Sequence, residues 1–235
     1  MSANRLLLEA RAAGGRTLVS RIRADGLLRA SRPFREGTAS RVVVAHLGPG
    51  MIRGDAFAIG GEVAPGAHLV VAGQMATRVL SGPEPATHDA RWHVHAGARL
   101  ELRPEPVLVS GGAAYVGTTT LVLEDGASAT VSEIVLRERG AAVRTTIVVR
   151  RATRLALVDA LAIDAEAPAA PAVGTLLFLA DVDVGALDAC ADAMPDVRVG
   201  IGTFREGDVL LRVTGAGVRE IDAALRVLRA MAQKG

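Results

Sequence analysis

The chain has 235 residues, of which 27 are basic and 25 are acidic, so its formal net charge is only +2. No run of like charges is present, which argues against a nucleic-acid-binding arm and against a polybasic membrane patch. Cys190 is the single cysteine, which excludes an internal disulfide and a cysteine-based zinc cage, and no stretch approaches the 18 or more apolar residues of a membrane span, so we expect a soluble, cytoplasmic protein.

Residues 15–165 are predicted to be almost entirely strand and turn. Three segments repeat a Gly-Ala step between two alternating stretches, and their glycines are 31 and 29 residues apart. They are GEVAPGAHLVVA at 61–72, WHVHAGARLELR at 92–103 and LVLEDGASATVSE at 121–133. Pro65-Gly66 fits a type II turn, and Asp125-Gly126 is a strong hairpin signal. The repeats predict a mainly β fold, a coil of stacked antiparallel β-hairpins.

A proline- and alanine-rich loop at 164–172 ends this region, and a different pattern follows. Strands are predicted at 174–180, 197–204 and 208–215, and apolar residues at helical spacing predict two C-terminal α-helices at about 183–194 and 217–233. We therefore expect a single domain over 1–235, with a β-hairpin body at about 15–165 and an α+β part at about 173–235.

His93, His95 and Glu101 form one candidate metal site. The two histidines are two residues apart on a predicted strand, so they share a face, and Glu101 follows across the Gly97 turn. Two imidazoles and a carboxylate suit iron or manganese, which would make the chain a cupin-like metal-dependent enzyme. The glutamate lies further from the histidines than in cupins, and no histidine follows His95 to complete a second motif. The competing interpretation is two solvent-facing histidines beside an arginine-flanked glutamate.

Glu133 is a second candidate, because strand alternation places it on the same face as Val131 and Val135. A carboxylate on an apolar face must be paired, hydrogen-bonded, protonated, or in contact with water or a metal. The alternative is an edge strand whose glutamate simply reaches solvent.

The bend GPGMIRGD at 48–55 does not have the Gly-Lys-Ser/Thr ending of a phosphate-binding loop. No nucleophile elbow and no Ser-His-Asp set stands out elsewhere. We therefore expect no catalytic residues, and we interpret the bend as a tight corner whose glycines adopt positive φ and whose Asp55 caps or lines it.

Several segments in order resemble the UreD family of urease accessory proteins, called UreH in some organisms. They are SRPFREG, VVVAHLGPGMIRGDAF, VAPGAHLVVA, GARLELRPEPVLVSGGAAY and SEIVLRERG, and the similarity extends through the C-terminal part. The signature positions here are Arg32, Pro33, Phe34, His46, Gly50, Gly54, Asp55, Pro65 and Gly66. Family members usually carry Lys-Phe-Tyr-Arg after the first hairpin, whereas this chain has MATRVLS at 75–81 and keeps only a basic Arg78.

The resemblance implies a non-catalytic scaffold with the coiled-hairpin fold. Such a protein docks on apo-urease, recruits a helical accessory protein of the UreF type and a GTPase of the UreG type, and helps deliver nickel through an internal passage. It implies no tightly bound cofactor, only nickel in transit, for which weak oxygen ligands are suitable. Asp55, Glu101 and Glu133 are the candidate transit residues, and Arg78 is a candidate partner contact. The lost aromatic segment leaves open a β-rich binding module that has diverged from a role with urease.

Overall fold

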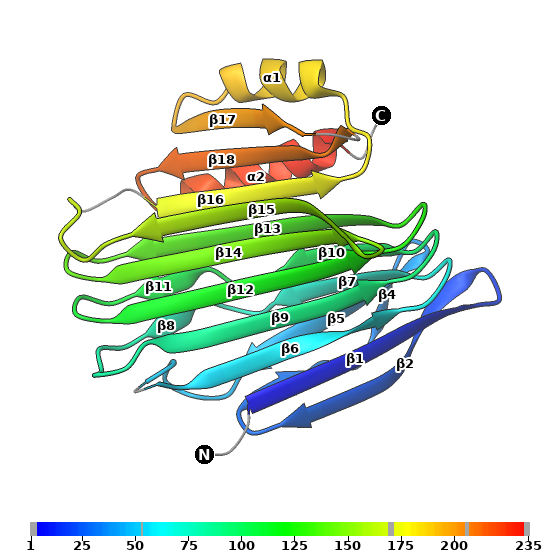
Figure 1. Cartoon of the computed structure of the whole chain (residues 1–235), viewed down its shortest axis with the longest axis horizontal. Coiled ribbons are helices and arrows are strands. Elements are labelled where there is room, and N and C mark those ends of the chain that lie inside the picture. Colours follow the sequence, from blue (N-terminus) through cyan, green and yellow to red (C-terminus); the bar gives the residue numbers. More distant parts are fainter. Residues whose placement is uncertain (1–3, 53, 169–171, 205–206, 233–235) are drawn as a thin grey trace.

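The computed structural model describes residues 4–52, 54–168, 172–204 and 207–232. The predicted helix end at 233 and residues 169–171 of the predicted loop lie outside these ranges. The described chain forms two stacked β-sheets, and two helices lie at the C-terminal end of the stack (Figure 1). The mainly β fold class, its stacked coils and its two helices are thus confirmed.

Sheet A is the sheet nearer the viewer in Figure 1. Its strands in spatial order are β15 (Arg154–Ile163), β14 (Ala142–Arg151), β12 (Ala114–Leu123), β9 (Ala86–Val94), β6 (Ala56–Val63), β1 (Asn4–Ala13) and β2 (Arg16–Asp25). Strand β1 precedes residue 15, where the sequence analysis placed the start of the β body. The body therefore begins earlier than predicted, with an antiparallel β1–β2 pair that forms one edge of the sheet.

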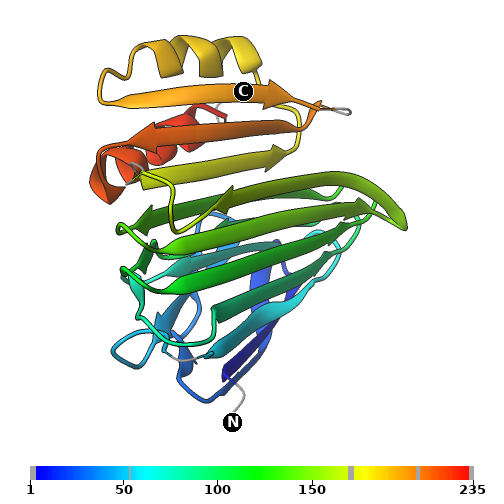
Figure 2. The ribbon, with the colours of Figure 1, turned by 60° about the vertical axis from the view of Figure 1, so that its left-hand side comes forward.

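Sheet B lies behind sheet A and extends beyond it (Figure 2). Its main path contains β17 (Val197–Thr203), β18 (Val209–Gly215), β16 (Ala172–Leu179), β13 (Ser128–Arg137), β10 (Arg99–Arg103), β7 (His68–Gly73), β5 (Ala39–His46) and β3 (Leu28–Ala30). Three short strands complete it: β4 (Phe34–Glu36) pairs with β5, β8 (Thr77–Val79) pairs with β11, and β11 (Val107–Val109) pairs with β13.

The three predicted repeats are corners between the sheets, and their flanking strands do not form hairpins. Strands β6 and β7 flank Gly66 but lie in different sheets, as do β9 and β10, and β12 and β13. Each strand pairs in parallel with its counterpart in the next coil, as β6 does with β9 and β7 with β10. The prediction of antiparallel pairing within each repeat was therefore wrong. Alternating strands and turn residues occur both in antiparallel hairpins and in parallel stacked coils. Which of the two forms depends on contacts between residues about 30 positions apart.

The corner chemistry itself follows the prediction. Gly66, Gly97 and Gly126 have φ values of +69°, +65° and +69°, a region that costs glycine little. The amide of Ala67 donates to the carbonyl of Ala64 at 3.0 Å, which closes a four-residue turn. The alanine after each glycine is at most 5% exposed, so it turns inward and directs the chain into the opposite sheet.

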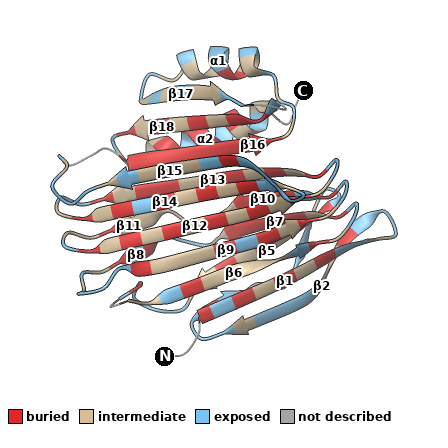
Figure 3. Ribbon diagram, viewed as in Figure 1, coloured by how far each residue is buried: buried red, intermediate tan, exposed pale blue. Residues whose placement is uncertain are grey.

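Two hydrophobic cores hold the molecule together (Figure 3). The larger core fills the space between sheets A and B, and the smaller one lies between the extension of sheet B and the helices α1 (Val184–Asp192) and α2 (Val218–Ala232). Strand β16 separates them and is buried along its whole length, with Leu177 in the first core and Leu176 in the second. Both helices begin close to their predicted starts and α1 ends close to its predicted end, and Asp183 caps α1 by accepting from the amide of Ala186 at 3.0 Å.

Candidate functional site

A cavity of about 90 Å³ lies between the two sheets. By the volume that one enclosed water requires, this space has room for several water molecules. Its lining is mostly apolar, but polar side chains reach it from both sheets. They are His46, Thr77, His88, Glu105, Tyr115, Thr118, Thr119, Glu133 and Thr145. A largely apolar cavity with a few convergent polar groups is the usual character of a binding site in proteins.

Glu133 reaches this cavity from β13. Val131 and Val135 on the same strand face are buried in the core between the sheets, which confirms the shared face expected from alternation. The strand is central in sheet B, flanked by β10 and β16, so the expectation that an edge strand carries Glu133 to solvent was wrong. The hydroxyl of Thr119 on β12 donates to Glu133 Oε1 at 3.1 Å.

Burial raises the pKa of Glu133 from 4.5 to about 7. The hydrogen bond from Thr119 and the charge of Arg212 oppose this rise, while the charge of Asp159 adds to it. At neutral pH the carboxyl group is thus close to the midpoint of its titration. A cation that binds this carboxylate displaces the proton to water, and a proton returns when the cation leaves.

Arg212 extends the polar line from the cavity toward the edge strand of sheet A. Strand pairing places Glu133 opposite Thr175 and Thr175 opposite Arg212 across β13, β16 and β18. The guanidinium donates to the Thr175 hydroxyl and, through Nη2, to both carboxylate oxygens of Asp159 on β15, at 2.6 and 2.8 Å. This ion pair joins the two sheets beside Glu133 and keeps a positive charge near it.

His46 and His88 supply imidazoles to the same cavity. Among the described residues, the Nε2 atoms of both rings are buried and have no hydrogen-bond partner. Burial lowers the pKa of His88 from 6.5 to about 4, against an opposing effect of Asp89, so the ring is neutral near pH 7. The His46 ring packs edge-on against Phe57, with centroids 4.6 Å apart. A buried imidazole nitrogen that lacks a protein partner calls for water or a cation.

Tyr115 and Glu105 complete the polar lining. Burial raises the pKa of Tyr115, and the charges of Glu133 and Glu105 raise it further, so its hydroxyl keeps its proton. Thr77 donates to Glu105 Oε1 at 2.8 Å. A side chain at Gly73 would place its Cβ 2.1 Å from the other oxygen of Glu105, so the strand can pass this carboxylate only with glycine there.

The family model described as UreD urease accessory protein matches residues 2–235. The chain belongs to the UreD family. A protein named urease accessory protein UreD from Sorangium cellulosum is 26% identical over 233 residues, covering 90% of this chain and 75% of that protein. Another of that name, from a Bacillus species, is 26% identical over 221 residues, covering 84% and 82% of the two chains.

A third UreD relative, from Cupriavidus metallidurans, is 38% identical over 128 residues, which are 53% of this chain and 43% of that protein. All of these relatives are named as accessory proteins. Among the described residues, no helix combines the length and the apolar character needed to cross a membrane.

Most residues of the UreD signature lie on the surface or at turns. Arg32, Pro33 and Phe34 are exposed, and Arg41 lies over the Phe34 ring at 5.5 Å from its centroid. The Arg78 side chain is also exposed. His46 is the exception, since it lines the cavity.

The glycine-rich bend is a corner built against β8. Gly50 and Gly54 have φ values of +141° and +74°, and a Cβ at Gly50 would lie 2.4 Å from the carbonyl oxygen of Arg78. Asp55 caps the bend by accepting from the amide of Ile52 at 2.8 Å. Asp55 does not line the cavity that contains Glu133.

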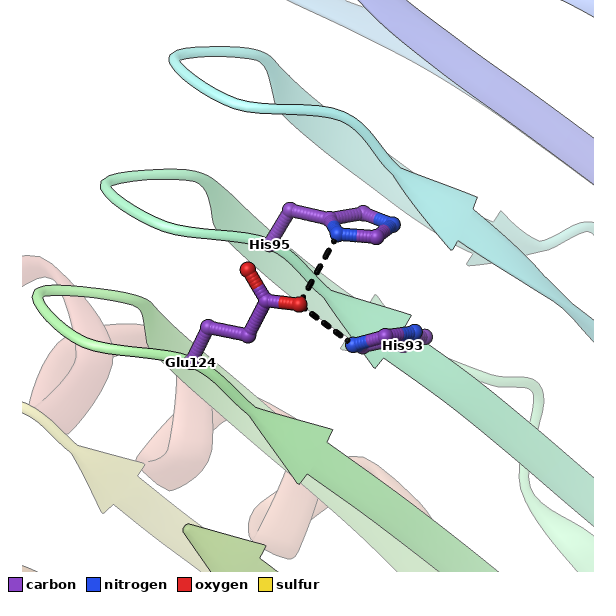
Figure 4. A group of neighbouring side chains, drawn as sticks. All are labelled: His93, His95 and Glu124. Carbon is purple, nitrogen blue, oxygen red and sulfur yellow. Dashed lines mark hydrogen bonds and ion pairs between the residues drawn. The ribbon is translucent and has the colours of Figure 1, made fainter. Parts of the chain in front are cut away.

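The predicted His93, His95 and Glu101 triad is not assembled. Glu101 lies in sheet B, where it accepts from His68 Nε2 at 2.9 Å and forms an ion pair with Arg103. Burial alone would raise its pKa, but these two partners outweigh burial and lower the pKa to about 2. The two histidines instead face Glu124, which follows β12 (Figure 4). The corner at Gly97 sends Glu101 into the other sheet, whereas a hairpin would have kept it beside the histidines.

Sequence reasoning missed His88, Glu105 and Tyr115 as lining residues. For His88 a signal was present in the sequence. Every second residue of β9 faces the core, namely Ala90, Trp92 and Val94, and His88 continues this series on the same face. Glu124 also had a signal, because it begins the turn at 124–127 as His95 begins the turn at 95–98. In a coil, equivalent turn positions are neighbours.

Proposed function

We propose that this UreD family member is a non-catalytic scaffold of urease maturation, which docks on apo-urease and helps deliver nickel to its active site. In this proposal a helical accessory protein of the UreF type and a GTPase of the UreG type join the complex. Membership of a family named for its accessory role supports this assignment. We also propose that the complex works in the cytoplasm, because the proposed GTPase partner requires GTP.

The observation that carries the nickel proposal is the polar cavity between the sheets. Its donors are imidazole nitrogens, carboxylates and hydroxyls, which bind divalent nickel. These donors lie along the cavity walls, and the described lining residues include no cysteine thiolate. Ligands of this kind suit an ion that must be released again, because they hold it less tightly than a thiolate cage would. We assign Glu133 as the transit carboxylate, because it can exchange its proton for the cation near neutral pH. Asp55 and Glu101 lie outside the lining and are not included.

The exposed segment Arg32, Pro33 and Phe34 and, separately, the exposed Arg78 on β8 are the proposed contacts for protein partners. All four residues are exposed, and the Phe34 side chain remains 46% exposed although its ring contacts Arg41. Aromatic and arginine side chains are enriched at protein interfaces.

The proposal is tested in a host that expresses a urease operon with this gene. Deletion of the gene is expected to leave the purified urease nickel-free, and Glu133→Ala is expected to lower its nickel content. Glu9→Gln is the matched control, because Glu9 is a carboxylate in the β1–β2 pair, bonded to Arg21 away from the cavity. Full nickel content in the deletion strain would refute the maturation role and would favour a β-rich binding module with another partner.

A separate test concerns the assembly. Co-expression with the helical accessory protein is expected to give a soluble 1:1 complex, measured by light scattering after size-exclusion chromatography. Phe34→Ala and Arg78→Ala together are expected to weaken that complex. Unchanged binding by the double variant would remove these residues from the proposed contacts without affecting the nickel proposal.

A further inference from the structure

The three side chains His93, His95 and Glu124 converge on one point of the molecular surface. His93 Nε2 lies 2.9 Å and His95 Nδ1 lies 3.0 Å from the same carboxylate oxygen, Glu124 Oε1. One donor atom from each residue lies within 4.8 Å of the other two. The rings are adjacent, with centroids 4.1 Å apart, and Figure 4 shows both turned toward the carboxylate. Trp92 and Val94 of the same strand point into the core, so the cluster is on the outer face of sheet A, away from the interior cavity.

The main chain holds these side chains in place. The amide of Glu124 donates to the carbonyl of Val94 at 3.0 Å, and the amide of Ala96 donates to Glu124 Oε2 at 3.0 Å. The amide of His95 donates to the carbonyl of Val63 in the preceding coil at 3.0 Å. His95 and Glu124 are therefore fixed at corners of neighbouring coils, and His93 lies near the end of β9, so the site is preorganised by successive coils.

His95 has a carboxylate on each side of its ring. Nδ1 faces Glu124, and Nε2 lies 3.7 Å from Oε2 of Glu62 on β6. A cation bound at Nδ1 leaves the ring hydrogen on Nε2, on the side of Glu62. A metal-binding histidine whose other nitrogen faces a carboxylate is the common arrangement in metalloproteins.

We propose that His93 Nε2, His95 Nδ1 and Glu124 Oε1 bind a divalent first-row transition cation, with Glu62 orienting His95. Imidazole and carboxylate ligands suit nickel and zinc, whereas calcium and magnesium prefer sites made of oxygen alone. Ligands at about 2.1 Å from such an ion are separated by roughly 3.0–3.4 Å, and the two nitrogen–oxygen separations here are close to that range. The cluster is partly exposed, so the remaining coordination positions are open to water or to a group from a partner. This site does not depend on the proposed role in urease maturation.

The test is metal binding by the purified full chain with a tag that contains no histidine. Isothermal titration with NiCl₂ or ZnCl₂ is expected to show saturable binding, and MgCl₂ is expected to show none. His93→Ala combined with His95→Ala is expected to weaken binding more than 100-fold, and Glu62→Gln, which removes only the orienting carboxylate, 10- to 100-fold. His68→Gln is the matched control, because it removes a histidine paired with Glu101 elsewhere and leaves an amide that can still donate.

Co²⁺ gives a second readout. The electronic spectrum of the bound ion reports nitrogen ligands, and the histidine double variant is expected to abolish that spectrum while its circular dichroism remains that of the wild type. Glu9→Gln, which changes a carboxylate of the β1–β2 pair bonded to Arg21, is expected to leave it unchanged. Absence of Ni²⁺ and Zn²⁺ binding by the wild type, or equal affinity in the double variant, would overturn the proposal. Either result leaves the urease nickel assay of the proposed function unaffected, so the two can fail separately.

Discussion

Glu133→Gln should make the protein more stable at alkaline pH, because it removes a carboxyl group that ionises with difficulty. The folded-state pKa of Glu133 is about 7, against 4.5 for the free group. The unfolded chain therefore loses this proton first as the pH rises. Stability that is present below pH 4.5 is lost progressively up to about pH 7, where the folded state also begins to ionise.

The size of this loss follows from the two pKa values. Each pK unit corresponds to about 1.4 kcal/mol, so the difference between 4.5 and about 7 amounts to about 3 kcal/mol at most. The variant keeps an oxygen that can accept from Thr119. We expect the free energies of unfolding of wild type and Glu133→Gln to be similar at pH 4.5 and to differ by up to about 3 kcal/mol, in favour of the variant, at pH 8.

The assay is urea unfolding between pH 4.5 and 8, followed by the fluorescence of Trp92, the single tryptophan, which is 3% exposed. Glu101→Gln is a control of opposite sign. The pKa of Glu101 is lowered to about 2, so its contribution is present above pH 4.5 and is lost as the pH falls toward 2. That variant should lose up to about 3 kcal/mol at pH 7. If the difference in unfolding free energy between wild type and Glu133→Gln did not change with pH, the raised folded-state pKa of Glu133 would be refuted.

Other substitutions probe the interior and the C-terminal part. In the wild type, the free energy of unfolding should fall as the pH drops from 6.5 to about 4, because His88 stays neutral in the folded state while the unfolded chain takes up the proton. His88→Phe should remove this loss, and the same pH dependence of urea unfolding in both proteins would contradict the prediction. Gly174→Ala should cost about 1–3 kcal/mol, since its Cβ would lie 2.5 Å from Ile221 Cγ2 of α2. Gly200→Ala should be neutral in thermal unfolding, since its Cβ would meet only the carbonyl oxygen of Arg212, in ordinary contact at 4.0 Å. Arg137→Ala should cost about 3 kcal/mol in urea unfolding, because this buried side chain donates to several loop carbonyls; a loss under 1 kcal/mol would exclude that role.

The local part of the fold could be predicted from the sequence, and the partners of each strand could not. Alternation and turn residues gave the strands, the two helices and the positive φ of Gly66, Gly97 and Gly126. They do not distinguish a hairpin from a corner, because in both the chain reverses at a glycine. Two further corners, at Gly112-Ala113 and Gly140-Ala141, close the other end of the coils and were not recognised as members of the same pattern.

The candidate sites show the same limit. Glu133 could be recognised as unusual, because its apolar neighbours two residues away signal a buried face. The charge of Arg212 near it could not be predicted, since Arg212 lies on β18, which is distant in sequence. The sequence analysis predicted Glu101 beside His93 and His95 because it paired β9 with β10 as a hairpin. These two strands lie in different sheets, so Glu101 is in the sheet opposite the histidines. Glu124 takes its place because parallel stacking aligns positions about one repeat apart.

The parallel stacking of the coils also limits how the length of this scaffold can change during evolution. Each strand hydrogen-bonds only to the strands directly above and below it, so a complete turn of chain can be inserted or deleted while every remaining strand keeps its register. A change of one residue within a strand would instead rotate each following side chain to the opposite face. Differences in size among homologues should therefore come in whole turns of about 30 residues, or fall in the loops, and an alignment that opens a single gap inside a strand is misplaced.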